Sequence, residues 1–294
     1  MNIIKNRYFL TLILAIAGIS VSAALEGILA LFLILSVGLL HGSNDLMVIQ
    51  RLASYEQISG LTRLKTLLAY IGLILIVLIL FSTQRQFALL FFVLISSFHF
   101  GQQHWHRLIK GAHWIRYVFY TSYGLLIFGL LFWTHAEQSS LVIEAITSVS
   151  LTANHFRVLS VVAFGLTVLT LIATPRIPFR FLLIEVGALV FLFIVFRYTS
   201  LLLSFALYFS LWHAAPSIRD QIELLYPKSL SSGLKSYAKA AWLYWGISVV
   251  GFGLILFLVG FNTLDVLELL VYFLAAITFP HVIVMSRVEK ALES

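Results

Sequence analysis

The chain of 294 residues contains no cysteine and few charged residues. The lack of cysteine excludes disulfide bonds, thiolate metal ligands and iron–sulfur clusters, so histidine and carboxylate side chains are the strong metal ligands that remain. Charged residues make up 11% of the chain and hydrophobic residues 61%. Because a soluble globular domain is about half apolar and about a quarter charged, this composition predicts a polytopic membrane protein.

Long apolar runs account for most of the sequence. Ten of them are long enough to cross, or nearly cross, the ~30 Å hydrocarbon core of a bilayer: residues 8–25, 27–43, 64–82, 86–104, 114–133, 156–174, 178–196, 199–215, 240–260 and 265–285. We therefore predict an all-α fold, a transmembrane bundle of about ten helices (eight to ten) that forms one integral-membrane domain over residues 1–294. No pattern of a cleaved signal peptide stands at the N-terminus, so we expect the first helix to be retained.

The basic residues indicate how these helices cross the membrane. The net charge is +7, but Lys and Arg occur in short groups between apolar runs, as topology determinants do, so we expect no nucleic-acid binding. If the N-terminus is cytoplasmic, only Arg85, Arg157 and Arg197 of the 19 basic residues fall on the outer side. Since basic residues concentrate in cytoplasmic loops, both termini are predicted to be cytoplasmic.

Histidines occur where apolar runs end. Residues 96–106 place three histidines and two glutamines after the apolar run 87–98. Imidazole is costly to bury in hydrocarbon without a partner, so an intramembrane histidine is a candidate functional residue. Three other apolar runs carry a single histidine near their ends, namely His41, His213 and His281.

Together with His99, these histidines are predicted to lie at one depth, because each precedes a cytoplasmic basic residue by about one to three helical turns. Side chains at one depth on four helices can converge in the core of a bundle, as they do in ferritin-like metal sites. Three or four neutral imidazoles without a thiolate suit Fe(II), Zn or Cu. Iron with vacant positions would activate dioxygen.

Residues next to the histidines fit a ligand sphere. Asp45 follows His41 by four residues, so on a continuing helix it shares that face and can orient the imidazole. Gly42 and Gly101 each follow a histidine and permit close helix approach or a local break. Pro280 removes a backbone donor just before His281 and can kink the helix.

Simpler interpretations apply to several of these features. Histidines near helix ends often contact lipid headgroups, and we assign that role to His104, His106, His113, His135 and His155. Phe98, Phe100, Tyr208 and Trp212 lie next to the metal-site histidines and predict an apolar tunnel for a long apolar ligand, although aromatic residues also form interfacial belts. Glu185 is a costly intramembrane carboxylate that either pairs structurally or handles protons.

The motifs His41-Gly42-Ser43-Asn44-Asp45, His99-Phe100-Gly101 and Trp212-His213 resemble the Brp/Blh family of membrane-embedded β-carotene-cleaving enzymes. The similarity runs from the second helix to Pro280-His281. In that family, iron held by histidines uses dioxygen to split the central 15,15′ double bond of β-carotene into two retinals. The resemblance implies Fe(II) as cofactor, β-carotene and O2 as substrates, and His41, His99 and His213 as iron ligands. We also predict that Asp45 is a catalytic residue and that the protein lies in the bacterial inner membrane.

The sequence departs from the family pattern at the fourth ligand. The family has a second histidine four residues after the position of His213, and this chain has Ser217 there. His281 has the predicted depth to replace it. His104 is the alternative, although a spacing of five residues from His99 is awkward on a straight helix.

Two other functions remain open. A transporter or channel for metal ions or protons would use intramembrane histidines, but no internal repeat of the transporter kind is visible. A di-iron carotenoid hydroxylase or desaturase needs His-x-x-x-His or His-x-x-His-His boxes, and the chain has neither. The sequence fixes neither the preferred carotenoid nor the oligomeric state.

Overall fold

The computed structural model describes residues 2–55, 63–109, 112–174, 177–226, 230–260 and 262–293. Within these ranges every regular element is a helix and no strand occurs, which confirms the predicted all-α class. Each of the ten predicted apolar segments contains a helix. Three of the basic residues behind the predicted topology, Lys110, Arg176 and Lys228, lie outside the described residues.

The chain divides into two compact units, and neither is continuous in sequence. Unit 1 comprises residues 1–34 and 93–213, and unit 2 comprises residues 35–92 and 214–294. The chain passes between them three times: directly after Ile34, inside the helix α5 (Arg85–Trp105), and directly after His213.

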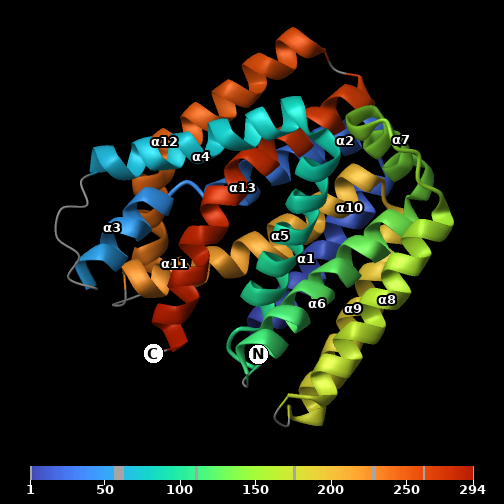
Figure 1. Cartoon of the computed structure of the whole chain (residues 1–294), viewed down its shortest axis with the longest axis horizontal. Coiled ribbons are helices and arrows are strands. Elements are labelled where there is room, and N and C mark those ends of the chain that lie inside the picture. The colour runs from blue at the N-terminus through green and yellow to red at the C-terminus, as the bar shows by residue number, and fades with distance from the viewer. Residues whose placement is uncertain are drawn as a thin grey trace. The chain divides into compact units, whose positions relative to one another are not determined.

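Unit 1 contains His99 and His213. Its long helices α6 and α8 run side by side (Figure 1). Besides the second half of α5, its elements are α1 (Asn2–Ile19), α2 (Ala23–Leu33), α6 (His113–Thr134), α7 (Ala136–Thr147), α8 (Ala153–Ile172), α9 (Phe179–Tyr198), α10 (Leu201–Leu207) and the π-helix η2 (Tyr208–Ala214), up to His213. Ser22 and Ser200 cap α2 and α10 by accepting hydrogen bonds from backbone amides of their first turns.

Unit 2 contains His41 and His281. In it α13 runs alongside α4 (Figure 1). Besides the first half of α5, its elements are the π-helix η1 (Ile34–Gly38), from Leu35 on, α3 (Asp45–Tyr55), α4 (Arg63–Thr83), α11 (Ala215–Leu225), α12 (Leu230–Val259) and α13 (Thr263–Glu293). Among the described residues, its apolar core includes the cluster Val48, Leu52, Val284, Met285 and Val288.

Seven helical stretches of the described chain are long and apolar enough to cross a membrane. They are Leu64–Thr83, His113–Thr134, Ala153–Ile172, Phe179–Tyr198, Leu201–Leu225, Ser232–Val259 and Leu264–Val288. Their burial differs widely: 78% of the apolar window is buried in Leu201–Leu225 and only 11% in Ser232–Val259. Since apolar side chains that are exposed on such a helix require an apolar solvent, α12 has the surface of a lipid-facing helix.

The structure changes three predicted boundaries. The first apolar pair breaks at residues 20–22, not at 24–26. The segment predicted to end at residue 215 continues to Leu225, because α10, η2 and α11 follow one another without a gap. The helix α7 lies between the predicted runs 114–133 and 156–174, and the strongly amphipathic α11 extends beyond the predicted run 199–215. Amphipathic helices are hard to see by hydropathy because their polar face lowers the mean.

Two glycines let α5 and α6 pack backbone against backbone in unit 1. A Cβ at Gly101 of α5 would overlap the carbonyl of Tyr120, and a Cβ at Gly124 of α6 would overlap the carbonyl of Ser97. These contacts flank His99, which lies between Ser97 and Gly101 on α5. The small-residue approach predicted for Gly101 therefore fixes the position of the helix that carries His99.

We expect Gly101→Ala to destabilise the protein by about 1–3 kcal/mol or more, because the added methyl group meets a backbone carbonyl and no flexible side chain can yield. The melting temperature of the detergent-solubilised protein measures this. Gly165→Ala on α8 is the matched control, since nothing lies within 4 Å of its Cβ. An equal melting temperature for both variants would contradict the close packing of α5 and α6.

Candidate metal centre

His99 and His213 face each other inside unit 1. Their ring centroids are 4.7 Å apart with an interplanar angle of 80°. Each residue is only 1% exposed. The pair joins two segments that are more than a hundred residues apart in sequence, so the fold brings together two of the histidines that the sequence singled out.

Both π-helical segments of the described chain adjoin a predicted ligand. η1 ends at Gly38, three residues before His41, and η2 contains His213. A π-helix is rare and often lies at a functional site, because its wider turn shifts the side chains that follow it. Neither segment was predicted, because its residues continue the apolar run that precedes it.

A second pair of buried histidines lies in unit 2. The rings of His41 and His281 are nearly perpendicular, with centroids 4.6 Å apart. Residues 41–44 form a turn between η1 and α3, so the helix that would have placed Asp45 beside His41 does not continue. Nδ1 of His41 contacts the carbonyl of Gly38, and Asp45 bonds His281.

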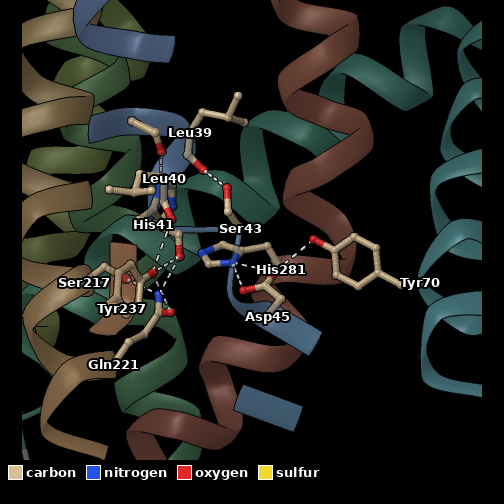
Figure 2. A network of polar contacts seen from close by, with 11 residues as sticks. Leu39, Leu40, His41, Ser43, Asp45, Tyr70, Ser217, Gln221, Tyr237 and His281 are labelled. Carbon is tan, nitrogen blue, oxygen red and sulfur yellow. Dashed lines mark hydrogen bonds and ion pairs between the residues drawn. The ribbon is translucent and has the colours of Figure 1, made fainter. Parts of the chain in front are cut away.

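Asp45 is the centre of a hydrogen-bonded group of three side chains, shown in Figure 2. Nδ1 of His281 lies 2.9 Å from both carboxylate oxygens of Asp45. The hydroxyl of Tyr70 donates to Oδ2 of Asp45 over 2.8 Å. Asp45 is 2% exposed, and as the first residue of α3 its negative charge is favoured by the helix dipole.

The backbone carbonyl of His41 is held from two further helices of unit 2 (Figure 2). Nε2 of Gln221 donates to it over 2.6 Å, and the hydroxyl of Tyr237 lies 3.1 Å from it and 2.9 Å from Oε1 of Gln221. Gln221 also reaches Oγ of Ser217 at 3.5 Å. The turn that carries His41 is therefore fixed to α11 and α12 through its main chain.

The alternative ligand His104 lies in a different network, inside unit 1. Its Nε2 is 3.0 Å from Oε2 of Glu185 on α9, and the hydroxyl of Tyr123 donates to Oε1 of the same carboxylate. This pairing gives Glu185 the structural partner that burial of a carboxylate requires. It also ties α5 to α6 and α9.

Several histidines predicted to be interfacial contact backbone groups. His155 completes a capping box with Thr152 at the start of α8. Nε2 of His135 lies 2.8 Å from the carbonyl oxygen of Thr199, and Nδ1 of His106 lies 3.1 Å from the carbonyl oxygen of Gln103.

The aromatic residues predicted to bind substrate lie in different surroundings within unit 1. Phe100 packs 4.3 Å from the ring of His213 and also contacts Tyr208, with centroids 5.6 Å apart. Phe98 instead stacks on Tyr117, with centroids 5.2 Å apart.

Trp212 packs on the N-terminal helix. Arg7 lies over its indole ring at 4.2 Å, and its Nε1 donates to Thr11 over 3.0 Å. Of the four predicted substrate contacts, Phe100 is therefore the one whose ring packs on the ring of His213, and Tyr208 packs on Phe100.

Sequence reasoning missed the residues that support the histidines from other helices. Tyr70, Gln221 and Tyr237 lie on α4, α11 and α12, outside the histidine motifs that the sequence singled out. The four-residue spacing of Ser217 and Gln221 on α11 was a local signal for one of them. Nothing in the sequence linked Tyr70 to Asp45.

The donor set fits a metal of borderline softness. Four buried imidazoles form two close pairs, one in each unit, and the chain has no thiolate. Imidazole nitrogen suits Zn, Cu and Fe, whereas Mg and Ca prefer oxygen ligands. The carboxylate on His281 is the kind of outer partner that ligating histidines usually have.

Apolar helices of membrane-crossing length around paired, buried histidines define a membrane protein with an intramembrane polar site. The chain belongs to the β-carotene 15,15′-dioxygenase family, whose pattern matches residues 32–289. This membership confirms the resemblance predicted from the histidine motifs. No curated protein matches the chain, and no solved structure does.

The support of the His41 carbonyl yields a stability prediction. Tyr237→Phe removes a buried hydroxyl that bonds this carbonyl and Gln221, so we expect a loss of about 1–3 kcal/mol. Tyr244→Phe on the same helix alters a residue that is 41% exposed, and we expect a change within about 0.5 kcal/mol. Chemical denaturation in detergent measures both variants. Equal effects would show that the hydroxyl of Tyr237 does not support the turn.

Proposed function

We propose that this protein is an Fe(II)-dependent dioxygenase that cleaves β-carotene at its central 15,15′ double bond. The observation that carries this proposal is the family match over residues 32–289, which includes all four paired histidines. One O2 molecule and one C=C bond give two C=O groups, so both oxygen atoms end in the two retinal products and no other reductant is needed.

His41, His99, His213 and His281 would hold the iron. When bound, the iron supplies the activation of dioxygen. The protein supplies neutral nitrogen donors that stay buried, which is favourable because solvent water would otherwise compete for the metal.

The substrate has no polar group, so its binding rests on burial of apolar surface at roughly 25 cal/mol per Å². Phe100, which packs on His213, and Tyr208, which packs on Phe100, are the aromatic contacts that the proposal assigns to the polyene. In such a reaction we expect the protein to position one particular double bond of the conjugated chain at the reacting centre.

Cleavage is tested by expression in a bacterium that makes β-carotene. We expect the cells to lose their orange colour and retinal to appear in extracts. His41→Ala, His99→Ala and His213→Ala are each expected to abolish cleavage because each removes a proposed ligand. His155→Ala is the matched control, since this histidine only caps α8, and it should cleave normally. Unchanged pigment with folded, iron-supplied protein would reject the proposal.

A transporter or channel is the second candidate function, and the buried His104–Glu185 pair is the observation that favours it. Intramembrane carboxylate–imidazole pairs occur in proton relays. Metal uptake into proteoliposomes without carotenoid turnover would support this function and contradict the dioxygenase.

The proposal includes insertion in the bacterial inner membrane with both termini in the cytoplasm. The natural lack of cysteine makes this testable, because a single introduced cysteine is the only thiol. We expect Ser150→Cys, after α7, to react with a membrane-impermeant maleimide in intact spheroplasts. Ser236→Cys, early in α12, should react only after permeabilisation. Both residues are exposed. The opposite labelling pattern would invert the proposed topology.

A further inference from the structure

Asp45, Tyr70 and His281 form a hydrogen-bonded group of three side chains, whereas an ion pair that only stabilises the fold needs two. We propose that Asp45 is a positioning residue that acts through His281, holding this imidazole so that its Nε2 is the atom offered to the metal, with Tyr70 fixing the carboxylate. This inference rests on the proposed function, since it assumes that the site binds a metal ion.

The hydrogen bonds decide where the proton sits on His281. An ionised carboxylate can only accept hydrogen bonds, so Nδ1, which lies 2.9 Å from both oxygens of Asp45, carries the proton. In the neutral ring, Nε2 then holds the lone pair that can bind a metal. A partner on the other ring nitrogen fixes both the tautomer and the orientation of the ring.

The neighbouring histidine is held in the same way. Nδ1 of His41 contacts the carbonyl oxygen of Gly38, which also accepts only, so the lone pair of His41 is on Nε2 as well. Its ring lies against that of His281, with centroids 4.6 Å apart. Unit 2 thus contains two adjacent buried imidazoles in the same tautomer. Both rings therefore keep the same nitrogen, Nε2, for a ligand.

Tyr70 and Gly42 keep this arrangement in place. The hydroxyl of Tyr70, on α4, donates to Oδ2 of Asp45, so the carboxylate is fixed from a third helix and cannot turn away from the ring (Figure 2). A Cβ at Gly42 would lie 3.6 Å from Nδ1 of His281, which shows that the turn after His41 packs directly on the ring. The orientation of the His281 ring is therefore held by its hydrogen bond to Asp45, which Tyr70 fixes, and by the packing of Gly42.

This arrangement also bears on the fourth ligand. Ser217 follows His213 by four residues, about one helical turn, and stands at the position where the family resemblance predicted a second histidine. Serine has no imidazole, and the hydroxyl here lies 3.5 Å from Gln221. His281 brings a fourth imidazole from α13, and its carboxylate partner raises the basicity of the ring.

The chain provides its own matched control. Glu185 and His104 form a second carboxylate–imidazole pair, partly buried, again with a tyrosine hydroxyl on the carboxylate. Here the bonded atom is Nε2 and the pair links α5 to α9. Glu185→Gln therefore removes the same kind of charge from the same kind of pair at a place where the inference assigns no metal ligand.

The experiment measures Fe(II) and Co(II) binding by the purified full-length protein in detergent, by competition with a chelator and by the visible absorption of bound Co(II). We expect Asp45→Asn to weaken metal binding about 10–100-fold and to change the Co(II) spectrum. Tyr70→Phe should weaken binding less, and Glu185→Gln should leave the dissociation constant and the spectrum unchanged.

A double-mutant cycle separates action through His281 from a general structural effect. In a His281→Ala background, Asp45→Asn should cause no further loss of affinity, because the group through which it acts is already gone. If Asp45→Asn does not fold, the same cycle is run with Tyr70→Phe, which leaves the carboxylate and the imidazole in place.

Each result has one meaning. Equal affinity of wild type and Asp45→Asn, or the same fold-loss with and without His281, overturns the inference. A wild-type protein that binds no Fe(II) overturns the proposed function. Metal binding that depends on Asp45 as predicted, without cleavage of β-carotene, supports the inference and rejects the proposed reaction.

Discussion

A buried imidazole in an apolar helical protein needs a polar partner, and the partner decides which ring nitrogen remains to act. Regular helices consume their own backbone groups, so partners must come from carboxylates or from places where the helix is broken. Both sources are used here. His281 and His104 bond carboxylates, and His41 contacts the carbonyl of Gly38 at the end of η1.

The irregular backbone around η1 illustrates the cost of such breaks and how it is met. A π-turn shifts the hydrogen-bond register, so carbonyl groups near it need other donors. Oγ of Ser210 donates to the carbonyl of Leu33 within unit 1, and Nε1 of Trp245 donates to the carbonyl of Leu35 within unit 2. Side chains from distant parts of the chain thus stabilise a local distortion that the proposed site uses.

Composition and hydropathy predicted the helical class and located a helix in every apolar segment, because the requirement to satisfy backbone groups in lipid leaves few alternatives. The local motifs at His41, His99 and His213 also identified the family. What could not be predicted depends on contacts between distant residues. The π-segments have no composition of their own, and α11 is too polar for hydropathy to join it to α10.

The partners of the histidines could not be predicted where they lie far away in the sequence. His104 stood as an alternative ligand because only its spacing from His99 was known. Its contact with Glu185 joins residues 81 positions apart and follows from the packing of α5 against α9. Likewise Tyr70 reaches Asp45 from α4, and no spacing rule links them.

The spacing along a helix identified Asp45 as a partner of a histidine, but its partner in the structure is His281 and not His41. The four-residue spacing from His41 picked out this carboxylate on the assumption of a continuous helix. The turn at residues 41–44 ends that helix and starts a new one at Asp45, where the positive end of the α3 dipole favours a negative charge. The same break that separates Asp45 from the imidazole of His41 presents its carboxylate to α13, so that the bond to His281 follows from the broken helix.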